Sequence, residues 1–205
     1  MMKKFLALLL ALGLMAALAA CDKLPSESSD PAPATSGAPV ESTEPAPEDN
    51  SGEVITPTDG SADGFIGDTL RTAFFDYTVN SAYTCAEFGG YTPAEGNRLL
   101  VVNLTVYNPT IQTQPMFDTD FQLGWGTPDE EGYDEMYGYP LETETPLCED
   151  QFPVEYELGI QETRTGTLVY EVPADYKDFS VSYWEYYSDG STGDMFFVYF
   201  TAEEQ

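Results

Sequence analysis

Carboxylates are the most abundant side chains of this chain that could do chemistry. The sequence has 36 aspartates and glutamates against 7 lysines and arginines. Clustered carboxylates on a loop suit Ca²⁺, which takes about six to eight oxygen ligands. The densest cluster lacks the Asp-x-Asp-x-Asp-Gly spacing of a calcium loop, so a solvated acidic loop is the alternative, and we assign no metal ligand. Its members are Asp129, Glu130, Glu131, Asp134 and Glu135, with Asp118 and Asp120 nearby.

Histidine is absent from the chain. Its absence excludes Ser-His-Asp and Cys-His nucleophiles, imidazole zinc sites and the ordinary proton shuttle near neutral pH. Paired carboxylates could still serve glycoside hydrolysis, but a chain with this many acids offers such pairs by chance. We therefore predict that the protein is not an enzyme, with no catalytic residue and no cofactor.

Aromatic side chains concentrate in segments 179–187 and 194–201. Strand alternation places Phe179, Val181, Tyr183 and Tyr187 on one face, and Ser180, Ser182, Trp184 and Tyr186 on the other. One face must pack in a core. The other is either covered by the long acidic stretch or exposed for recognition, as tyrosine and tryptophan favour, with stacking on a glycan as one form. The candidate binding surface is Trp184, Tyr186, Tyr133 and Tyr137.

The N-terminus has the pattern of a secretory signal. Lys3 and Lys4 form a positive region, an apolar run follows from Phe5, and small residues lead to Cys21. The apolar run is shorter than the ~20 residues that a membrane-spanning helix needs. We therefore expect residues 1–20 to be a signal peptide.

The end of this signal resembles the lipobox of bacterial lipoproteins, carried by Leu18-Ala19-Ala20-Cys21. The resemblance implies that Cys21 is lipidated and becomes the new N-terminus. It also implies an outward-facing location on the bacterial cell membrane, held by acyl chains rather than by a spanning helix.

The charge of the chain limits its partners. The formal charge of −29 becomes −31 when residues 1–20 and their two lysines are removed. Such a field disfavours nucleic acid and anionic lipid surfaces. It is compatible with cations, basic proteins or cationic peptides, or simply with solubility.

Of the three cysteines, one lies in the lipobox and two lie in the predicted domain. With Cys21 lipidated, Cys85 and Cys148 remain as a pair outside the cytoplasm, where disulfides persist. We predict a disulfide between them, with two buried free thiols as the alternative.

The rest of the chain separates into a tether and a domain. Residues 21–64 are rich in Pro, Ser and Glu without periodicity, which predicts a disordered tether. From residue 65 to residue 205, period-2 patterns predict strands. They cover 70–78, with a continuation through 83, then 98–107, 117–125, 163–172, 179–187 and 194–201. Asp189-Gly190 predicts a hairpin between the last two. An all-β antiparallel sandwich accommodates this number of strands.

These segments resemble the immunoglobulin-like domain of unknown function 4352, found in bacterial surface lipoproteins. The resemblance rests on Ile66-Gly67-Asp68-Thr69, on the strand 99–108 that ends in Asn108, on Phe121-Gln122-Leu123, and on the Gly-x-Leu-Val-aromatic-x-Val-Pro pattern of 166–173. It implies an immunoglobulin-like sandwich and implies no catalytic residue. The stretch 127–160 departs from the pattern, being longer and more acidic.

The sequence thus leads to two functional hypotheses. The first is a lipid-anchored extracytoplasmic binding module, whose ligand is an unknown envelope protein or glycan and not nucleic acid. The second is a structural or accessory subunit of an envelope complex with no ligand of its own. A hydrolase is a distant third.

Overall fold

The computed structural model describes residues 52–127, 130–131 and 135–205, which belong to one compact unit, Pro47–Gln205. The predicted signal peptide, Cys21 and residues 21–51 of the predicted tether lie outside the described residues. No helix of the described part is long and apolar enough to cross a membrane.

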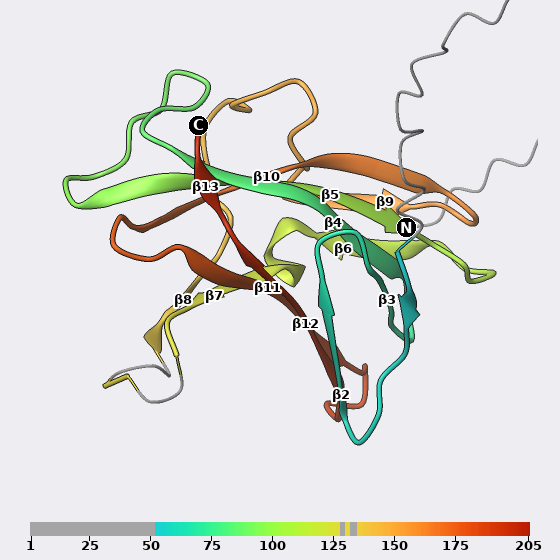
Figure 1. Ribbon diagram of the computed structural model, residues 1–205. Coiled ribbons are helices and arrows are strands. Elements are labelled where there is room, and N and C mark those ends of the chain that lie inside the picture. Colours follow the sequence, from blue (N-terminus) through green and yellow to red (C-terminus); the bar gives the residue numbers. More distant parts are fainter. Residues whose placement is uncertain (1–51, 128–129, 132–134) are drawn as a thin grey trace, which may run out of the picture. The chain divides into compact units, whose positions relative to one another are not determined.

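Two sheets form a sandwich (Figure 1), which confirms the predicted all-β fold. The first sheet has the strand order β1-β3-β4-β5-β10, and β13 joins it by pairing with β4. Its strands are β1 (Val54–Ile55), β3 (Thr69–Arg71), β4 (Asp76–Cys85), β5 (Asn97–Tyr107), β10 (Thr163–Pro173) and β13 (Glu203–Glu204).

The second sheet has the order β2-β12-β11-β7-β8. Its strands are β2 (Ser61–Phe65), β12 (Thr192–Thr201), β11 (Asp178–Tyr186), β7 (Gln122–Trp125) and β8 (Tyr137–Gly138). β6 (Gln114–Phe117) and β9 (Glu155–Leu158) form a separate two-stranded sheet. The short 3-10 helix η1 (Asp118–Asp120) directly follows β6 in the chain. Most pairings are antiparallel, but β1–β3, β2–β12 and β13–β4 are parallel.

The first two strands join different layers. β1 pairs with β3 in the first sheet, whereas β2 pairs with β12 in the second. The chain therefore changes layers twice between Ile55 and Thr69. The sandwich also begins earlier than the boundary at residue 65 that composition predicts. β2 pairs with β12, and its residues Ala62 and Gly64 are buried.

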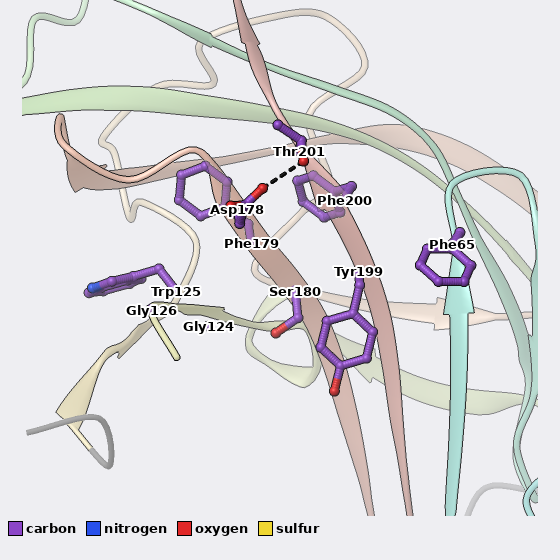
Figure 2. A pocket seen from close by; sticks show the side chains of 10 residues that line it. All are labelled: Phe65, Gly124, Trp125, Gly126, Asp178, Phe179, Ser180, Tyr199, Phe200 and Thr201. Carbon is purple, nitrogen blue, oxygen red and sulfur yellow. Dashed lines mark hydrogen bonds between the residues drawn. The ribbon is translucent and has the colours of Figure 1, made fainter. Parts of the chain in front are cut away.

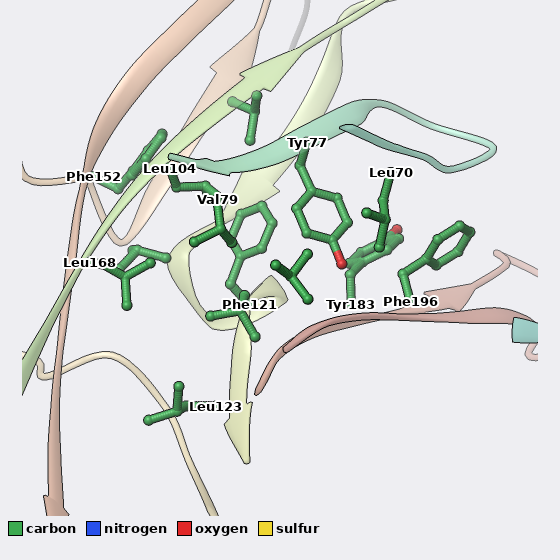
Figure 3. Packing of buried hydrophobic residues seen from close by; sticks show 14 of the residues in the cluster. Leu70, Tyr77, Val79, Leu104, Phe121, Leu123, Phe152, Leu168, Tyr183 and Phe196 are labelled. Atoms are coloured by element: carbon green, nitrogen blue, oxygen red, sulfur yellow. The ribbon is translucent and has the colours of Figure 1, made fainter. Parts of the chain in front are cut away.

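Alternating apolar residues of the facing sheets form the core (Figure 3). On β5 the predicted inward set Leu100, Val102, Leu104 and Val106 is fully buried. Phe179, Val181 and Tyr183 of β11 are buried as predicted. Aromatic rings fill the space between the layers, with the centroids of Phe75 and Tyr183 4.6 Å apart.

Two predicted strands are each interrupted by a local polar contact. The stretch 70–83 breaks at Thr72, whose hydroxyl donates to the carbonyl of Phe75 and accepts the amides of Phe74 and Phe75. This turn makes a hairpin of β3 and β4. The stretch 117–125 breaks at η1, where the Asp120 carboxylate accepts the Phe117 amide. Strand alternation cannot reveal such turns, because they replace ladder hydrogen bonds with side-chain ones.

Asn108 follows the end of β5, and its side chain is completely buried. The amide nitrogen Nδ2 donates to the carbonyls of Gln112, Leu158 and Gly159 at 2.8–3.0 Å. The oxygen Oδ1 accepts both the amide and the hydroxyl of Thr110. This one side chain therefore holds the segment after β5 against the end of β9.

The segment 139–153 runs along the edge strand β10 of the first sheet and packs Leu141 and Leu147 against the outer face of that sheet. Leu141 donates its amide to the Val169 carbonyl, and Phe152 donates its amide to the Thr167 carbonyl. A second, smaller apolar cluster lies here, made of Cys85, Leu99, Val101 and Val169, with Tyr83, Phe88, Tyr91, Leu141 and Leu147 packed against it. β5 and β10 are therefore apolar on both faces where this segment covers them.

Gly166 lies where that segment passes closest to β10. A Cβ atom at this position would lie 2.6 Å from the Asp150 carbonyl oxygen and 3.0 Å from the Phe152 ring. Because the nearest atom is backbone, Gly166→Ala is expected to lower the free energy of unfolding by about 2 kcal/mol, measured by urea denaturation. Gly138→Ala is the control, since its Cβ would only touch Trp125 at 3.4 Å. If the two variants are equally stable, the backbone of Asp150 does not approach Gly166 closely enough to exclude a Cβ atom.

Cys85 and Cys148 are both free thiols in this structure, which differs from the predicted disulfide. Cys85 is buried in the second cluster, and burial raises the pKa of its thiol. Burial and then a hydrogen bond to Asp150 raise the pKa of the Cys148 thiol. A raised pKa lowers the fraction of thiolate, the form that attacks another sulfur, for both cysteines.

Candidate functional site

The outer face of the second sheet carries exposed aromatic side chains. Trp184 and Tyr186 of β11 point away from the core, with 42% and 63% of their surface exposed. Figure 2 shows the same alternation further along the strands: Ser180 and Tyr199 point to one side of the sheet, and Phe179 and Phe200 point to the other. The predicted division into an inner and an outer face is therefore confirmed within β11. The prediction is wrong for Tyr187, which was expected on the inner face but lies beyond the end of β11 and is 40% exposed.

A groove of about 590 Å³ lies on this face and is called here the aromatic groove. Its floor combines small residues that neighbouring strands bring side by side. Ser180 is in register with Gly124 of β7, and Ser182 is in register with Gln122. The lining residues are Thr119, Asp120, Gln122, Gly124, Met136, Tyr137, Tyr139, Ser180, Ser182, Tyr183, Trp184, Tyr186 and Phe197.

Aromatic rings stand on both sides of this floor. On one side Tyr137 of β8 meets Tyr139 edge to face, with ring centroids 6.0 Å apart, and the Gln122 amide donates to the Tyr139 hydroxyl at 3.1 Å. On the other side Phe197 and Tyr199 of β12 stack at 5.9 Å. β11 lies between β7 and β12, and its residues Ser180 and Ser182 are on the outer face. The groove forms because these small side chains lie between the aromatic rings of β8 and β12.

Two further hollows adjoin the aromatic groove. One, of about 440 Å³, shares Asp120, Tyr183, Trp184 and Tyr186 with it and extends toward Phe74 and Pro115. The other, of about 290 Å³ and drawn in Figure 2, shares Gly124 and Ser180 and extends toward Phe65 and Trp125. An extended ligand could therefore occupy more than the central groove.

Asp120 is the acidic residue that lines both the aromatic groove and the larger of these hollows. Burial, and to a smaller extent the charge of Asp118, raise the pKa of its carboxyl to about 6, although the hydrogen bond from the Phe117 amide lowers it. Asp118 is only 5% exposed, and its Oδ1 has no hydrogen-bond partner. Burial likewise raises the pKa of Asp118.

No basic residue lines any of the three hollows among the described residues. The arginines are paired elsewhere: Arg71 with Asp76, Arg98 with Glu204 and Arg164 with Glu162. Among the described residues, therefore, no lysine or arginine shares the groove with the carboxyl group of Asp120.

The calcium hypothesis finds no support in the described residues. They contain no group of three or more Cys, Asp or Glu side chains that could hold a metal ion. Glu130 accepts a hydrogen bond from the Tyr176 hydroxyl at 2.9 Å, and Glu130 also accepts the Thr127 amide. Asp129 and Asp134 lie outside the described residues.

Three of the four predicted binding residues, Trp184, Tyr186 and Tyr137, line the same groove. Tyr133 lies outside the described residues. Trp184 and Tyr186 remain 42% and 63% exposed, so the described residues of the acidic stretch do not bury them. Tyr137 and Tyr139 of that stretch nevertheless line the same groove. Sequence reasoning missed the serine floor and Asp120, although the alternation of β11 already placed Ser180 and Ser182 on this face.

Three solved structures resemble the fold. The candidate lipoprotein ycdA of Bacillus subtilis has a TM-score of 0.49 and 13% identity over 65% of this chain, which spans only 38% of that one. A candidate lipoprotein of Staphylococcus aureus has a TM-score of 0.43 and 12% identity over 69% of this chain and 94% of its own. An uncharacterized β-sandwich protein of Clostridium difficile (CD630_09570) has a TM-score of 0.40 and 11% identity over 68% and 93%. No family model and no curated protein matches the chain.

Proposed function

We propose that this protein is a lipid-anchored, extracytoplasmic binding module whose ligand occupies the aromatic groove. The observation that carries the proposal is the exposure of Trp184 and Tyr186 beside a floor of small residues. Large aromatic side chains cost free energy when left in water, and they dominate recognition surfaces when they line a concave site. The module has no catalytic role in this proposal.

The anchoring part of the proposal rests on the sequence. Leu18-Ala19-Ala20-Cys21 follows an apolar run, as in lipoproteins that carry lipid on cysteine, and the Pro- and Glu-rich residues after it supply a spacer. We extend the proposal to the resemblance with domain of unknown function 4352, supported by strands at 97–107 and 163–173, where two of the resembling segments lie. On this view the module lies on the outer side of the cell membrane.

The test compares single variants for retention on isolated bacterial cell envelopes. Each variant is made in the full chain with Cys21→Ser, so that no lipid anchor holds it. Trp184→Ala and Tyr186→Ala are then each expected to lower retention about tenfold, which is the loss typical of an aromatic hot spot. Their urea midpoints should stay close to the parent, because both side chains are largely exposed. Ile111→Ala is the matched control, since Ile111 is 85% exposed and lies outside the groove.

Two results would decide against this proposal. Parent-like retention of both aromatic variants would place the binding surface elsewhere. Retention that occurs only alongside other envelope proteins, and that neither aromatic variant lowers, would favour the accessory-subunit alternative.

A further inference from the structure

The aromatic groove contains an acid whose charge the fold does not balance. Asp120 lines the groove and the adjoining larger hollow, and Asp118, two residues earlier in η1, is buried with Oδ1 unpartnered. No basic residue is among the described residues that line either hollow. A partly buried carboxylate without a cation costs stability at neutral pH, and such a cost points to a functional role.

The rings around this carboxylate supply the second half of a cation site. Trp184, Tyr186 and Tyr137 line the groove and are 42–63% exposed. A lysine or arginine over the face of such a ring is attracted by the ring quadrupole, most strongly at tryptophan. The same chain already makes this contact internally, where the Arg164 guanidinium lies 4.6 Å from the centroid of the Tyr156 ring.

We propose that the aromatic groove binds a basic peptide segment, with a lysine or arginine side chain placed between the aromatic rings and Asp120. The proposal rests on the proposed function and names the chemistry of its ligand. Charge complementarity selects this occupant: the whole chain carries a net charge of −29, and the groove adds a carboxylate to its aromatic lining. A neutral glycan would use the aromatic faces but would leave that carboxylate without a counter-charge.

Binding should depend on pH through Asp120. The charged groups and phenols that act on it are Asp118 of η1, Tyr156 of β9 and Tyr183 of β11. Burial raises the pKa of both phenols, so they stay neutral near pH 7. With a carboxyl pKa of about 6, roughly a tenth of Asp120 is ionised at pH 5, so affinity for a cation should fall about tenfold between pH 7.5 and pH 5.

The experiment is calorimetric titration of the full-length protein in a neutral detergent with three probes. The first is the peptide acetyl-Gly-Lys-Gly-Lys-Gly-amide, the second is its glutamine analogue, and the third is the neutral oligosaccharide chitotetraose. Only the lysine peptide is expected to bind. Trp184→Ala and Asp120→Asn are each expected to weaken it about tenfold, and Asp120→Asn should also remove the pH dependence. Asp63→Asn, an exposed acid outside the groove, is the control for net charge.

Each contrary result has a separate meaning. Equal binding of the lysine and glutamine peptides, or parent-like binding by Asp120→Asn, would overturn the cation proposal. Binding of chitotetraose alone, abolished in Trp184→Ala, would overturn it in favour of a glycan while leaving the proposed function intact. No binding of any probe, with envelope retention still sensitive to Trp184→Ala, would also overturn the cation proposal alone. Envelope retention that is insensitive to Trp184→Ala would instead overturn the proposed function.

Discussion

Asn108→Asp is expected to lower the free energy of unfolding by about 4 kcal/mol at pH 7. The substitution keeps the size of the side chain but replaces the donor Nδ2 with a carboxylate oxygen. That oxygen would face the carbonyls of Gln112, Leu158 and Gly159 in a fully buried site. Buried carbonyls that lose their donor, together with a charge that has no cation, account for the size of the effect. Urea unfolding followed by tryptophan fluorescence measures it.

Two comparisons make this prediction specific. Asn108→Ala should cost nearly as much, because it removes the donor without adding a charge. At pH 3 the aspartic acid is protonated and can again donate one hydrogen bond, so Asn108→Asp should recover part of its loss relative to the parent. If the free energy of unfolding of Asn108→Asp at pH 7 is within about 1 kcal/mol of that of the parent, Asn108 does not hold these segments together.

Asp120→Asn is expected to stabilise the protein by about 2 kcal/mol at pH 7.5. The folded-state pKa of this carboxyl is raised from 3.8 to about 6, so the folded state binds the proton more tightly than the unfolded state. The resulting stabilisation is complete below pH 4 and is lost as the pH rises through 6. About two units of pKa correspond to roughly 3 kcal/mol. Asparagine avoids the loss and can still accept the Phe117 amide through Oδ1.

The measurement is urea unfolding at intervals from pH 4 to pH 7.5. The parent should lose stability across this range relative to Asp120→Asn, and the two curves should converge at the acidic end. Asp63→Asn removes the same charge from an exposed site and should run parallel to the parent. If Asp63→Asn stabilises as much as Asp120→Asn, the gain comes from reduced self-repulsion of an acidic chain rather than from burial of Asp120.

The sequence predicts the long strands well and the short irregular elements poorly. β5 and β10 are found within a residue of their predicted limits, because a long stretch of aliphatic and β-branched residues and a proline at or just after the end mark both of them. β1 and β2 were missed, since segments of two and five residues among prolines and glycines carry no measurable period. Their pairing depends on partners such as Met195, more than a hundred residues away, which local patterns do not contain.

In the candidate site, too, local alternation predicts some residues and not others. Trp184 and Tyr186 could be assigned to the outer face from alternation alone, because the two residues belong to one strand. The role of Asp120 could not be predicted, because it depends on η1 interrupting the stretch 117–125 next to β11. The sequence offered Asp120 only as one acid among many, whereas in the structure Asp120 lines the same two hollows as Trp184 and Tyr183.

The early change of layers has a mechanical consequence. A load applied through the N-terminal end of the described residues reaches β1 first and β2 next, and these strands belong to opposite sheets. β2 is in parallel register with five consecutive residues of β12, the strand that also contributes Phe197 to the aromatic groove. In the proposed module, tension between the lipid anchor and a bound partner would therefore load the backbone ladders of both layers. The strand that lines the proposed binding surface would share that load with β2.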